Sequence, residues 1–326
     1  RAGPGRPTMT RAFVFPGQGS QAVGMGAELA AAFPCAREVF QEVDDALDQH
    51  LSRLMAEGPE SELTLTRNAQ PALMAVSLAV ERVLAREGGF HLPERGSHVA
   101  GHSLGEYSAL AATGALGLAD TARLLRIRGE AMQSAVPVGQ GAMAALMGLD
   151  LETVTAIAEE AAQDGGAGAV CAPANDNAPG QVVISGHAGA VARAIALAKA
   201  RGAKRAVELA VSAPFHCALM QPAAEAMAQA LDAVAIAAPA LPVVANATAT
   251  EMQAPETIRA RLVAQVTQPV RWRESVLHLR EAGVDSLVEL GAGKVLSGLA
   301  RRIDRKLEAV SLGTPTEIET FLESAT

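Results

Sequence analysis

Aromatic residues, cysteines and positive charge are all scarce in this sequence of 326 residues. It holds one Trp, one Tyr and seven Phe, and 35 Asp and Glu outnumber 27 Lys and Arg, which gives a formal net charge of −8. A groove that binds nucleic acid needs clustered basic residues and stacking surfaces. We therefore expect no nucleic-acid partner.

The three cysteines, Cys35, Cys171 and Cys217, lie far apart and form no C-x-x-C pair. This spacing gives no sign of a disulfide framework or a zinc ribbon, and it favours a reducing, cytoplasmic location. The longest nearly apolar run, residues 72–80, is much shorter than the ~20 residues that a membrane-spanning helix needs. We expect no membrane segment and no metal or redox cofactor.

Apolar residues make up 49% of the chain, as in a globular protein with a large core. The run 12–15 ends at Pro16-Gly17-Gln18-Gly19, which predicts a buried strand followed by a turn. Apolar residues recur at helical spacing over 26–54 and over 71–86, the second segment following Asn68 as a plausible helix cap. The first strand is therefore expected to lie among helices.

From about residue 136 the order of predicted elements changes to βαββαβ. The strands are expected at 142–149, 169–172, 181–184 and 205–210, and the helices at 151–162 and 188–200. This order predicts a small ferredoxin-like α+β subdomain over residues 136–209. Strands and helices alternate again after it, which predicts one discontinuous, hydrolase-like α/β domain, doubly wound around a mostly parallel sheet, from residues 9–135 and 210–326. Residues 1–8 are expected to be a disordered extension or an expression remnant.

The segment Gly101-His102-Ser103-Leu104-Gly105 carries the clearest chemical signal. A short strand pattern, 98–101, precedes it and a helical pattern, 106–112, follows it. G-x-S-x-G between a strand and a helix is typical of a nucleophilic serine raised above the end of a sheet. The alternative is an ordinary glycine turn, because the motif also occurs by chance.

A nucleophilic serine needs a base, and His216 is the favoured candidate among seven histidines. It lies in Ser212-Ala-Pro-Phe-His-Cys217, between a predicted strand and a predicted helix, where functional side chains are often displayed. A capping or core role is the alternative for His216. His102 is expected to point away from Ser103 if the backbone there is extended.

Eight motifs in order give the chain a strong resemblance to the malonyl-CoA:acyl carrier protein transacylases, the bacterial fatty acid synthesis type of the acyltransferase domain family. They span nearly the whole chain from Met9 and are Phe15 to Gln21, Gln70-Pro-Ala, Gly101 to Glu106, Arg128-Gly, Gln140-Gly-Ala-Met-Ala, Asn177-Ala-Pro-Gly-Gln-Val-Val, Ser212 to Cys217, and Glu289-Leu-Gly-Ala-Gly-Lys294.

The resemblance implies a ping-pong transfer. Ser103 would take the malonyl group from malonyl-CoA as an ester, and His216 would remove its proton and later activate the pantetheine thiol of acyl carrier protein. A backbone carbonyl, that of Gln265, would orient His216, and the N–H groups of Gln18 and Leu104 would hold the oxyanion.

Substrate selection is implied to rest on Arg128, whose guanidinium would grip the malonyl carboxylate with two parallel hydrogen bonds. Taken from the residues alone, an arginine in the segment 123–128 more often belongs to a solvated helix face, and only the resemblance favours a binding role for Arg128. Phe215 resembles the Phe-His pair of malonyl-selective domains and would leave little room for a methyl branch. Further pocket candidates are Gln70, His102 and Asn177, and the chain is expected to act as a monomer.

Other readings stay open at this point. The same fold could serve as a discrete polyketide acyltransferase or as an acyl-carrier hydrolase. A chain without catalysis could serve as a scaffold for acyl carrier protein, with a docking patch at Arg301, Arg302, Arg305 and Lys306. These four residues could equally form a solvated helix face.

Overall fold

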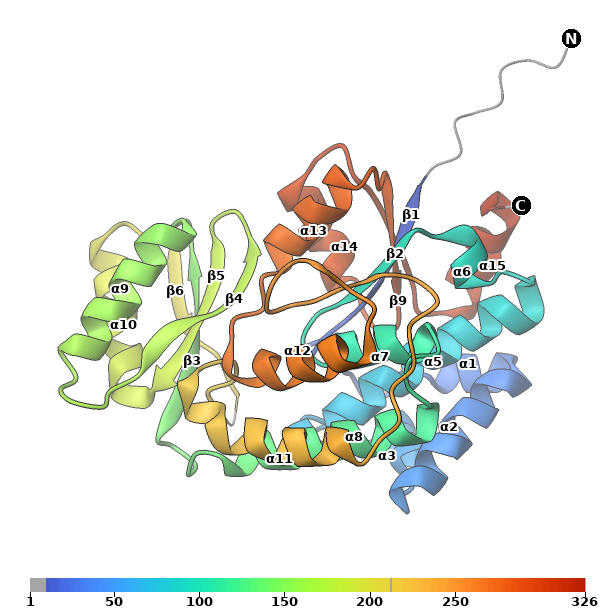
Figure 1. Ribbon diagram of the computed structural model, residues 1–326, viewed down its shortest axis with the longest axis horizontal. Coiled ribbons are helices and arrows are strands. Elements are labelled where there is room, and N and C mark those ends of the chain that lie inside the picture. Colours follow the sequence, from blue (N-terminus) through green and yellow to red (C-terminus); the bar gives the residue numbers. More distant parts are fainter. Residues whose placement is uncertain (1–9, 212, 326) are drawn as a thin grey trace, which may run out of the picture.

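The computed structural model describes residues 10–211 and 213–325, and it contains two β-sheets (Figure 1). A six-stranded sheet forms the centre of the molecule, and a four-stranded sheet lies beside it (Figure 1). The predicted extension, residues 1–8, lies outside the described residues.

The large sheet has the strand order β10-β9-β1-β2-β7-β8. Its strands are β1 (Arg11–Phe15), β2 (His98–Gly101), β7 (Val243–Val244), β8 (Glu251–Met252), β9 (Ser286–Leu290) and β10 (Glu308–Leu312). All neighbours pair in parallel except β7 and β8. The prediction of a mostly parallel, doubly wound sheet is therefore confirmed.

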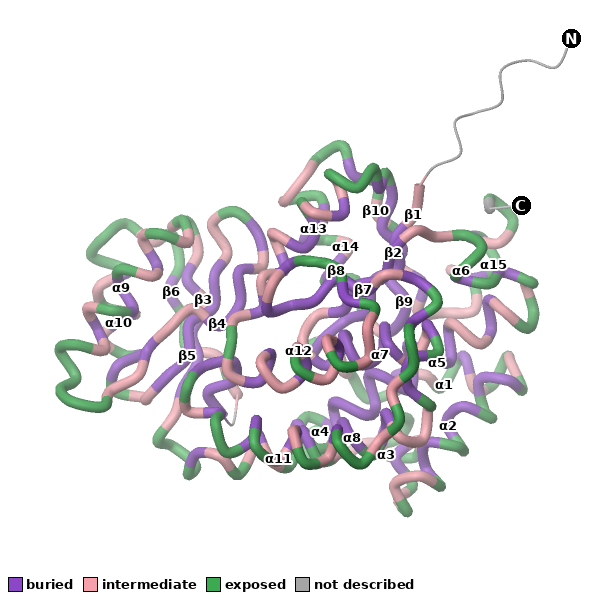
Figure 2. Tube along the Cα trace, in the orientation of Figure 1, coloured by how far each residue is buried: buried purple, intermediate pink, exposed green. Residues whose placement is uncertain are grey.

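Helices cover both faces of this sheet, because successive residues of a strand point to opposite sides. Phe13 and Phe15 pack into a cluster with α2 (Pro34–Leu47), α5 (Thr66–Gly88), α7 (Gly105–Ala112) and α8 (Leu118–Ser134). Ala12 and Val14 pack on the other side against α13 (Trp272–Glu281) and α14 (Val295–Ile303). Most residues of the central strands and of α5 are buried, and the exposed residues lie mainly on the outer helices and loops (Figure 2).

The remaining helices of the large domain lie around these layers. They are α1 (Ala27–Ala32), α3 (Leu51–Glu57), α4 (Glu60–Leu63), α6 (Leu92–Arg95), the 3-10 turn η1 (Ala218–Met220), α11 (Gln221–Asp232), α12 (Pro255–Thr267) and α15 (Pro315–Ala325). The predicted helical segment 26–54 is divided into α1, α2 and α3, since Pro34 starts α2 and Asp48 ends it in a left-handed conformation.

The predicted cap at Asn68 is wrong, because α5 begins earlier, at Thr66, and Leu65 is its N-cap. Pro71 therefore lies inside the helix and cannot donate to the carbonyl of Arg67. That carbonyl accepts a hydrogen bond from Arg126 Nε of α8 at 2.9 Å instead. A side chain distant in sequence thus satisfies the carbonyl that the proline leaves free.

The small sheet has the antiparallel order β4-β5-β3-β6. It consists of β3 (Gly141–Met147), β4 (Cys171–Ala178), β5 (Gln181–His187) and β6 (Arg205–Glu208), and α9 (Leu151–Gln163) and α10 (Ala188–Ala200) share one apolar cluster with it. The predicted βαββαβ order is present. The boundaries at 135/136 and 209/210 stay a prediction.

Candidate active site

A cavity of about 420 Å³ opens where the two sheets meet, at the carboxyl ends of β1 and β2. Parallel strands end together at one edge, and ligands of open α/β sheets bind in the crevice at that edge. The lining includes Gln18, Gln70, His102, Ser103, Leu104, Arg128, Met132, Met143, Asn177, Val183, Phe215 and His216. Strands of the small sheet, together with loops and helices around the large sheet, therefore line one cavity.

Ser103 stands in a sharp turn between β2 and α7. Its φ is 53°, a left-handed conformation that costs a residue with a side chain about 1–2 kcal/mol. The turn also needs two glycines, since a Cβ on Gly101 would lie 1.9 Å from the carbonyl oxygen of Gly105, and one on Gly105 would lie 2.2 Å from the carbonyl oxygen of Phe15. The glycine spacing of the motif thus has a steric cause.

His216 lies next to this turn, with Nε2 at 2.8 Å from Ser103 Oγ. Its Nδ1 is 2.9 Å from the backbone carbonyl oxygen of Gln265. A carbonyl oxygen only accepts hydrogen bonds, so Nδ1 carries the proton and Nε2 presents a lone pair to the serine hydroxyl. The structure brings together the serine, the histidine and the carbonyl that the sequence had paired.

His216 is 3% exposed, and it too has a left-handed backbone, with φ of 59°. Burial, and to a smaller extent the nearby positive charge of Arg128, together lower its pKa to about 3. The imidazole is consequently neutral at physiological pH. A neutral imidazole can accept the proton of Ser103 directly.

Arg128 of α8 reaches the same hydroxyl and is 1% exposed. Its Nη2 donates to Ser103 Oγ at 3.0 Å and to Gln265 Oε1 at 2.8 Å, while Nη1 donates to Gln70 Oε1 at 2.7 Å. Because guanidinium can only donate, Ser103 Oγ accepts from Arg128 and gives its own proton to His216. The hydroxyl is thus oriented from both sides.

The charge of Arg128 is balanced by no carboxylate within ion-pair distance among residues 10–211 and 213–325. Its bonds reach neutral amide and hydroxyl oxygens, and burial lowers its pKa. Nearby Glu106 is fully buried, and burial raises the pKa of that carboxyl to about 7. A desolvated cation at the cavity wall can bind an anionic ligand group strongly.

Gln18 and Leu104 both line the cavity. Leu104 directly follows Ser103 and precedes α7, and the Gln18 side chain is fixed by Thr66 Oγ1 at 2.9 Å. No hydrogen bond links the backbone N–H of either residue to an acceptor in the described part of the chain. Two free N–H donors at one cavity are what an oxyanion requires.

The other predicted pocket residues also line the cavity. His102 Nε2 lies 2.8 Å from Asn177 Oδ1 of β4, and burial lowers the pKa of this histidine. Phe215 stands beside His216, and its carbonyl accepts a hydrogen bond from Ser185 Oγ of β5 at 2.6 Å. The four basic residues at the end of α14 do not contribute to the lining.

Sequence reasoning missed Asn246, which bonds directly to the turn of Ser103. It also missed the side chain of Gln265, whose Nε2 donates to the carbonyl of Ser103 at 3.0 Å. Met132 and Met143 add apolar wall to the cavity. A polar residue two positions after the short strand 243–244 was the one available signal for Asn246.

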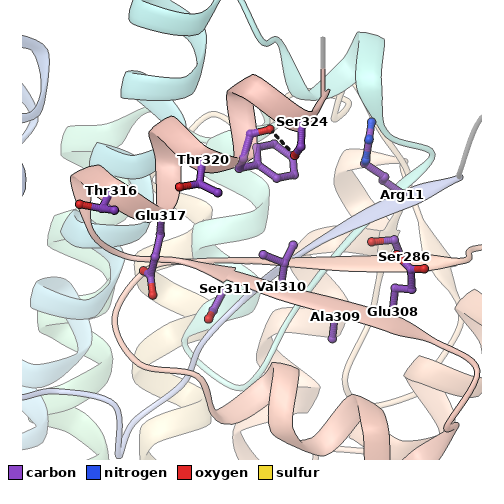
Figure 3. A pocket seen from close by; sticks show the side chains of 11 residues that line it. Arg11, Ser286, Glu308, Ala309, Val310, Ser311, Thr316, Glu317, Thr320 and Ser324 are labelled. Carbon is purple, nitrogen blue, oxygen red and sulfur yellow. Dashed lines mark hydrogen bonds between the residues drawn. The ribbon is translucent and has the colours of Figure 1, made fainter.

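A second cavity, of about 470 Å³, lies at the opposite end of the large sheet (Figure 3). It is bordered by Arg11, Ser286 and Glu308, the first residues of three neighbouring parallel strands, and by α15. Figure 3 shows hydroxyl, carboxylate and apolar side chains around it and no histidine or cysteine among the labelled residues. Among the described residues, no hydrogen bond joins a hydroxyl of this lining to the carboxylate of Glu308 or Glu317.

Metal clusters and membrane-spanning helices are both absent from the part of the chain that the structure describes. Within 10–211 and 213–325, no three His, Cys, Asp or Glu side chains are grouped as a metal ion would require. No helix in the same ranges combines the length and the apolar character that crossing a membrane demands.

Comparisons with known proteins agree with the geometry. Residues 12–310 match the family model described as "Acyl transferase domain". The malonyl CoA-acyl carrier protein transacylase of Escherichia coli (strain K12) is 48% identical over 312 residues, which cover 96% of this chain and 98% of that protein. The Bacillus subtilis (strain 168) protein of the same name is 46% identical and covers 96% of each chain.

Solved structures show the same likeness. The acyl-carrier-protein-S-malonyltransferase of Bartonella henselae superposes with a TM-score of 0.94 at 55% identity, covering 97% of this chain and 99% of that one. A malonyl-transacylase solved in complex with a type II PKS acyl-carrier protein gives a TM-score of 0.92 at 46% identity, with 97% and 99% covered. The match to the family model and the near full-length identity establish that this chain belongs to the acyl transferase domain family.

Proposed function

We propose that this chain transfers the malonyl group of malonyl-CoA to the phosphopantetheine thiol of acyl carrier protein, for fatty acid synthesis. The observation that carries the proposal is Arg128, a buried guanidinium 3.0 Å from Ser103 Oγ. An acyl group esterified to Ser103 would lie within reach of this cation. A malonyl group ends in the carboxylate that a guanidinium binds best.

In the first half of the reaction, Ser103 Oγ attacks the thioester carbonyl of malonyl-CoA while His216 Nε2 takes the hydroxyl proton. The N–H groups of Gln18 and Leu104 stabilise the oxyanion of the tetrahedral intermediate. The C–S bond then breaks, the leaving CoA thiolate takes the proton from His216, and malonyl-Ser103 remains.

The second half repeats these steps with a new thiol. The pantetheine thiol of acyl carrier protein gives its proton to His216 and attacks the ester carbonyl. The C–O bond to Ser103 breaks, and His216 returns the proton to the serine oxygen. The carbonyl of Gln265 stabilises the imidazolium that exists between the two proton transfers, because it accepts from Nδ1 at 2.9 Å.

Arg128 and Phe215 supply selectivity in this proposal. An acetyl group would leave the buried guanidinium without its anionic partner, which a site built for a charged group rejects strongly. Phe215 is 8% exposed at the cavity beside His216, so a methyl branch at C2 of the acyl group would meet its ring.

No step of this scheme calls for a metal or redox cofactor, because side chains and backbone N–H groups carry every proton and charge. The three cysteines are free and buried, which suits a reducing compartment, and we place the enzyme in the cytoplasm. We further propose that it acts as a monomer.

A carrier protein of polyketide synthesis is a second candidate acceptor. One similar malonyl-transacylase was solved with a type II PKS acyl-carrier protein. Transfer rates to carrier proteins of the two pathways, measured from the same malonyl-enzyme, would separate these acceptors.

Intact mass spectrometry tests the proposal. Wild-type protein incubated with malonyl-CoA should gain one malonyl group and lose it when holo acyl carrier protein is added. S103A should gain none. An adduct on S103A, or a wild type labelled equally well by acetyl-CoA, would contradict the assignment.

A further inference from the structure

Asn246 is fully buried two residues after the end of β7, the strand that pairs in parallel with β2. Its neighbours in the sequence, Ala245 and Ala247, offer no polar side chain. Because parallel strands end at the same edge of a sheet, Asn246 comes to lie beside the turn that follows β2. It does not line the cavity, so it would act on the reaction through other residues.

The side-chain amide of Asn246 joins the two ends of the Ser103 turn. Nδ2 donates to the carbonyl of Gly101 at 2.7 Å, and Oδ1 accepts from the N–H of Ser103 at 2.7 Å. A carbonyl can only accept and an N–H can only donate, so the orientation of the amide is fixed. One side chain thus satisfies the carbonyl of Gly101 and the N–H of Ser103. Ser103 itself has a left-handed φ of 53°.

Two further residues hold Asn246 in place. Its backbone N–H donates to Glu106 Oε2 at 2.8 Å, and its Oδ1 accepts a second hydrogen bond, from Gln265 Nε2 at 3.3 Å. The carbonyl of the same Gln265 orients His216. One hydrogen-bonded network, made of Asn246 and Gln265, therefore holds both the Ser103 turn and His216.

From this arrangement we propose that Asn246 is a positioning residue for acyl transfer, holding the Ser103 turn so that Oγ meets His216 in attack geometry. The proposal deepens the malonyl-transfer function and rests on it. The role requires an amide, since it must donate at one atom and accept at the other. A carboxylate would place an acceptor against the carbonyl of Gly101 and could replace the amide only when protonated.

The test compares Asn246→Asp and Asn246→Ala with the wild type for malonyl transfer to acyl carrier protein. A displacement of about 1 Å at reacting atoms can lower the rate about 100-fold. At pH 8 both variants should lose about this factor in kcat while KM for malonyl-CoA changes little. At pH 5.5 Asn246→Asp should recover about tenfold relative to wild type at that pH, and Asn246→Ala should not.

Asn68→Asp is the matched control. Asn68 is 3% exposed, and its Nδ2 donates to the carbonyl of Glu62 at 2.8 Å, but it lies outside the cavity lining. This variant should keep kcat and show no recovery in acid. Glu106 accepts from the Asn246 N–H and has a pKa of about 7, because burial raises it, so Glu106 itself titrates between pH 5.5 and pH 8. Arg128 and His216 keep their protonation states over this range. Every rate is therefore divided by the wild-type rate at the same pH.

Labelling by a fluorophosphonate, which reacts with activated serines and needs no malonyl group, is measured in parallel. The positioning role is supported if Asn246→Asp reacts more slowly than the wild type at pH 8 with both malonyl-CoA and the fluorophosphonate, and regains rate at pH 5.5 with both. Wild-type rates in a folded Asn246→Asp or Asn246→Ala variant overturn it, as does a loss in Asn246→Asp that is equal at all pH values. If the wild type is labelled by the fluorophosphonate but not by malonyl-CoA, the proposed malonyl transfer is overturned, while the positioning role of Asn246 is still tested by the fluorophosphonate rates.

Discussion

Replacing Arg128 by Met would separate its two contacts, one with Ser103 and one with the proposed substrate carboxylate. Met keeps much of the side-chain volume and removes the charge. Removing one partner of a buried ion pair costs about 3–5 kcal/mol. At 1.36 kcal/mol for each tenfold change, kcat/KM for malonyl-CoA should fall by about two to four powers of ten.

Acetyl-CoA should respond in the opposite direction. In the wild type an acetyl group leaves Arg128 buried without an anion, and Arg128→Met removes that penalty. We therefore expect kcat/KM for acetyl-CoA to stay level or rise, and the ratio of the two values to fall at least about 100-fold. The thermal midpoint should change little, because removing a buried charge that no carboxylate among the described residues pairs with offsets the loss of the hydrogen bonds to Gln70 and Gln265.

Arg126→Met, two residues earlier in α8, is the control. Arg126 does not line the cavity, but it satisfies the carbonyl that Pro71 leaves free. This variant should lose stability and keep the ratio of malonyl to acetyl transfer. If Arg128→Met lowers both transfers equally, the hydrogen bond to Ser103 is the important contact, and the reasoning about the carboxylate is refuted.

Two further predictions concern stability. The pKa of His216 is about 3 in the folded chain against an ordinary value of 6.5, so its neutral form stabilises the fold above pH 6.5, and this contribution is lost as pH falls toward 3. Between pH 7 and pH 5 the free energy of unfolding, measured by urea denaturation, should fall about 2 kcal/mol less in His216→Gln than in the wild type; an equal fall would contradict the buried neutral state. Gly101→Ala should lower the thermal midpoint strongly, because its Cβ would lie 1.9 Å from a backbone oxygen. Gly298→Ala, in open space within α14, should raise the midpoint slightly, because alanine favours a helix more than glycine does. Similar midpoints for both variants would contradict the steric explanation of the motif.

Motif residues were predictable because local sequence dictates their backbone. The glycines around Ser103 are required by contacts under 3 Å, so a local motif reports a tertiary constraint. The mostly parallel sheet was predictable for a similar reason, since the buried part of its central strand β1, residues 12–15, appears in the sequence as a continuous apolar run.

Residues that act through tertiary contacts were not predictable in this way. The side chains of Asn246 and Gln265 reach Ser103 from 143 and 162 positions away. The start of α5 was misplaced because Pro71 normally ends or begins a helix, and the bond from Arg126 that makes it tolerable comes from another helix. Local propensity contains no information about such partners.

Hydrogen bonds join the small sheet to the large domain at Phe215 and at Val270. Ser185 holds the carbonyl of Phe215, and the N–H of Asp176 donates to the carbonyl of Val270 at 2.9 Å. This sheet carries Met143, Asn177 and Val183 of the cavity wall, while Ser103 and Arg128 belong to the large domain. Part of the cavity wall thus comes from a different stretch of chain than Ser103 and Arg128, so grafting β3–β6 from a relative would change that wall while leaving the serine and its arginine in their native scaffold.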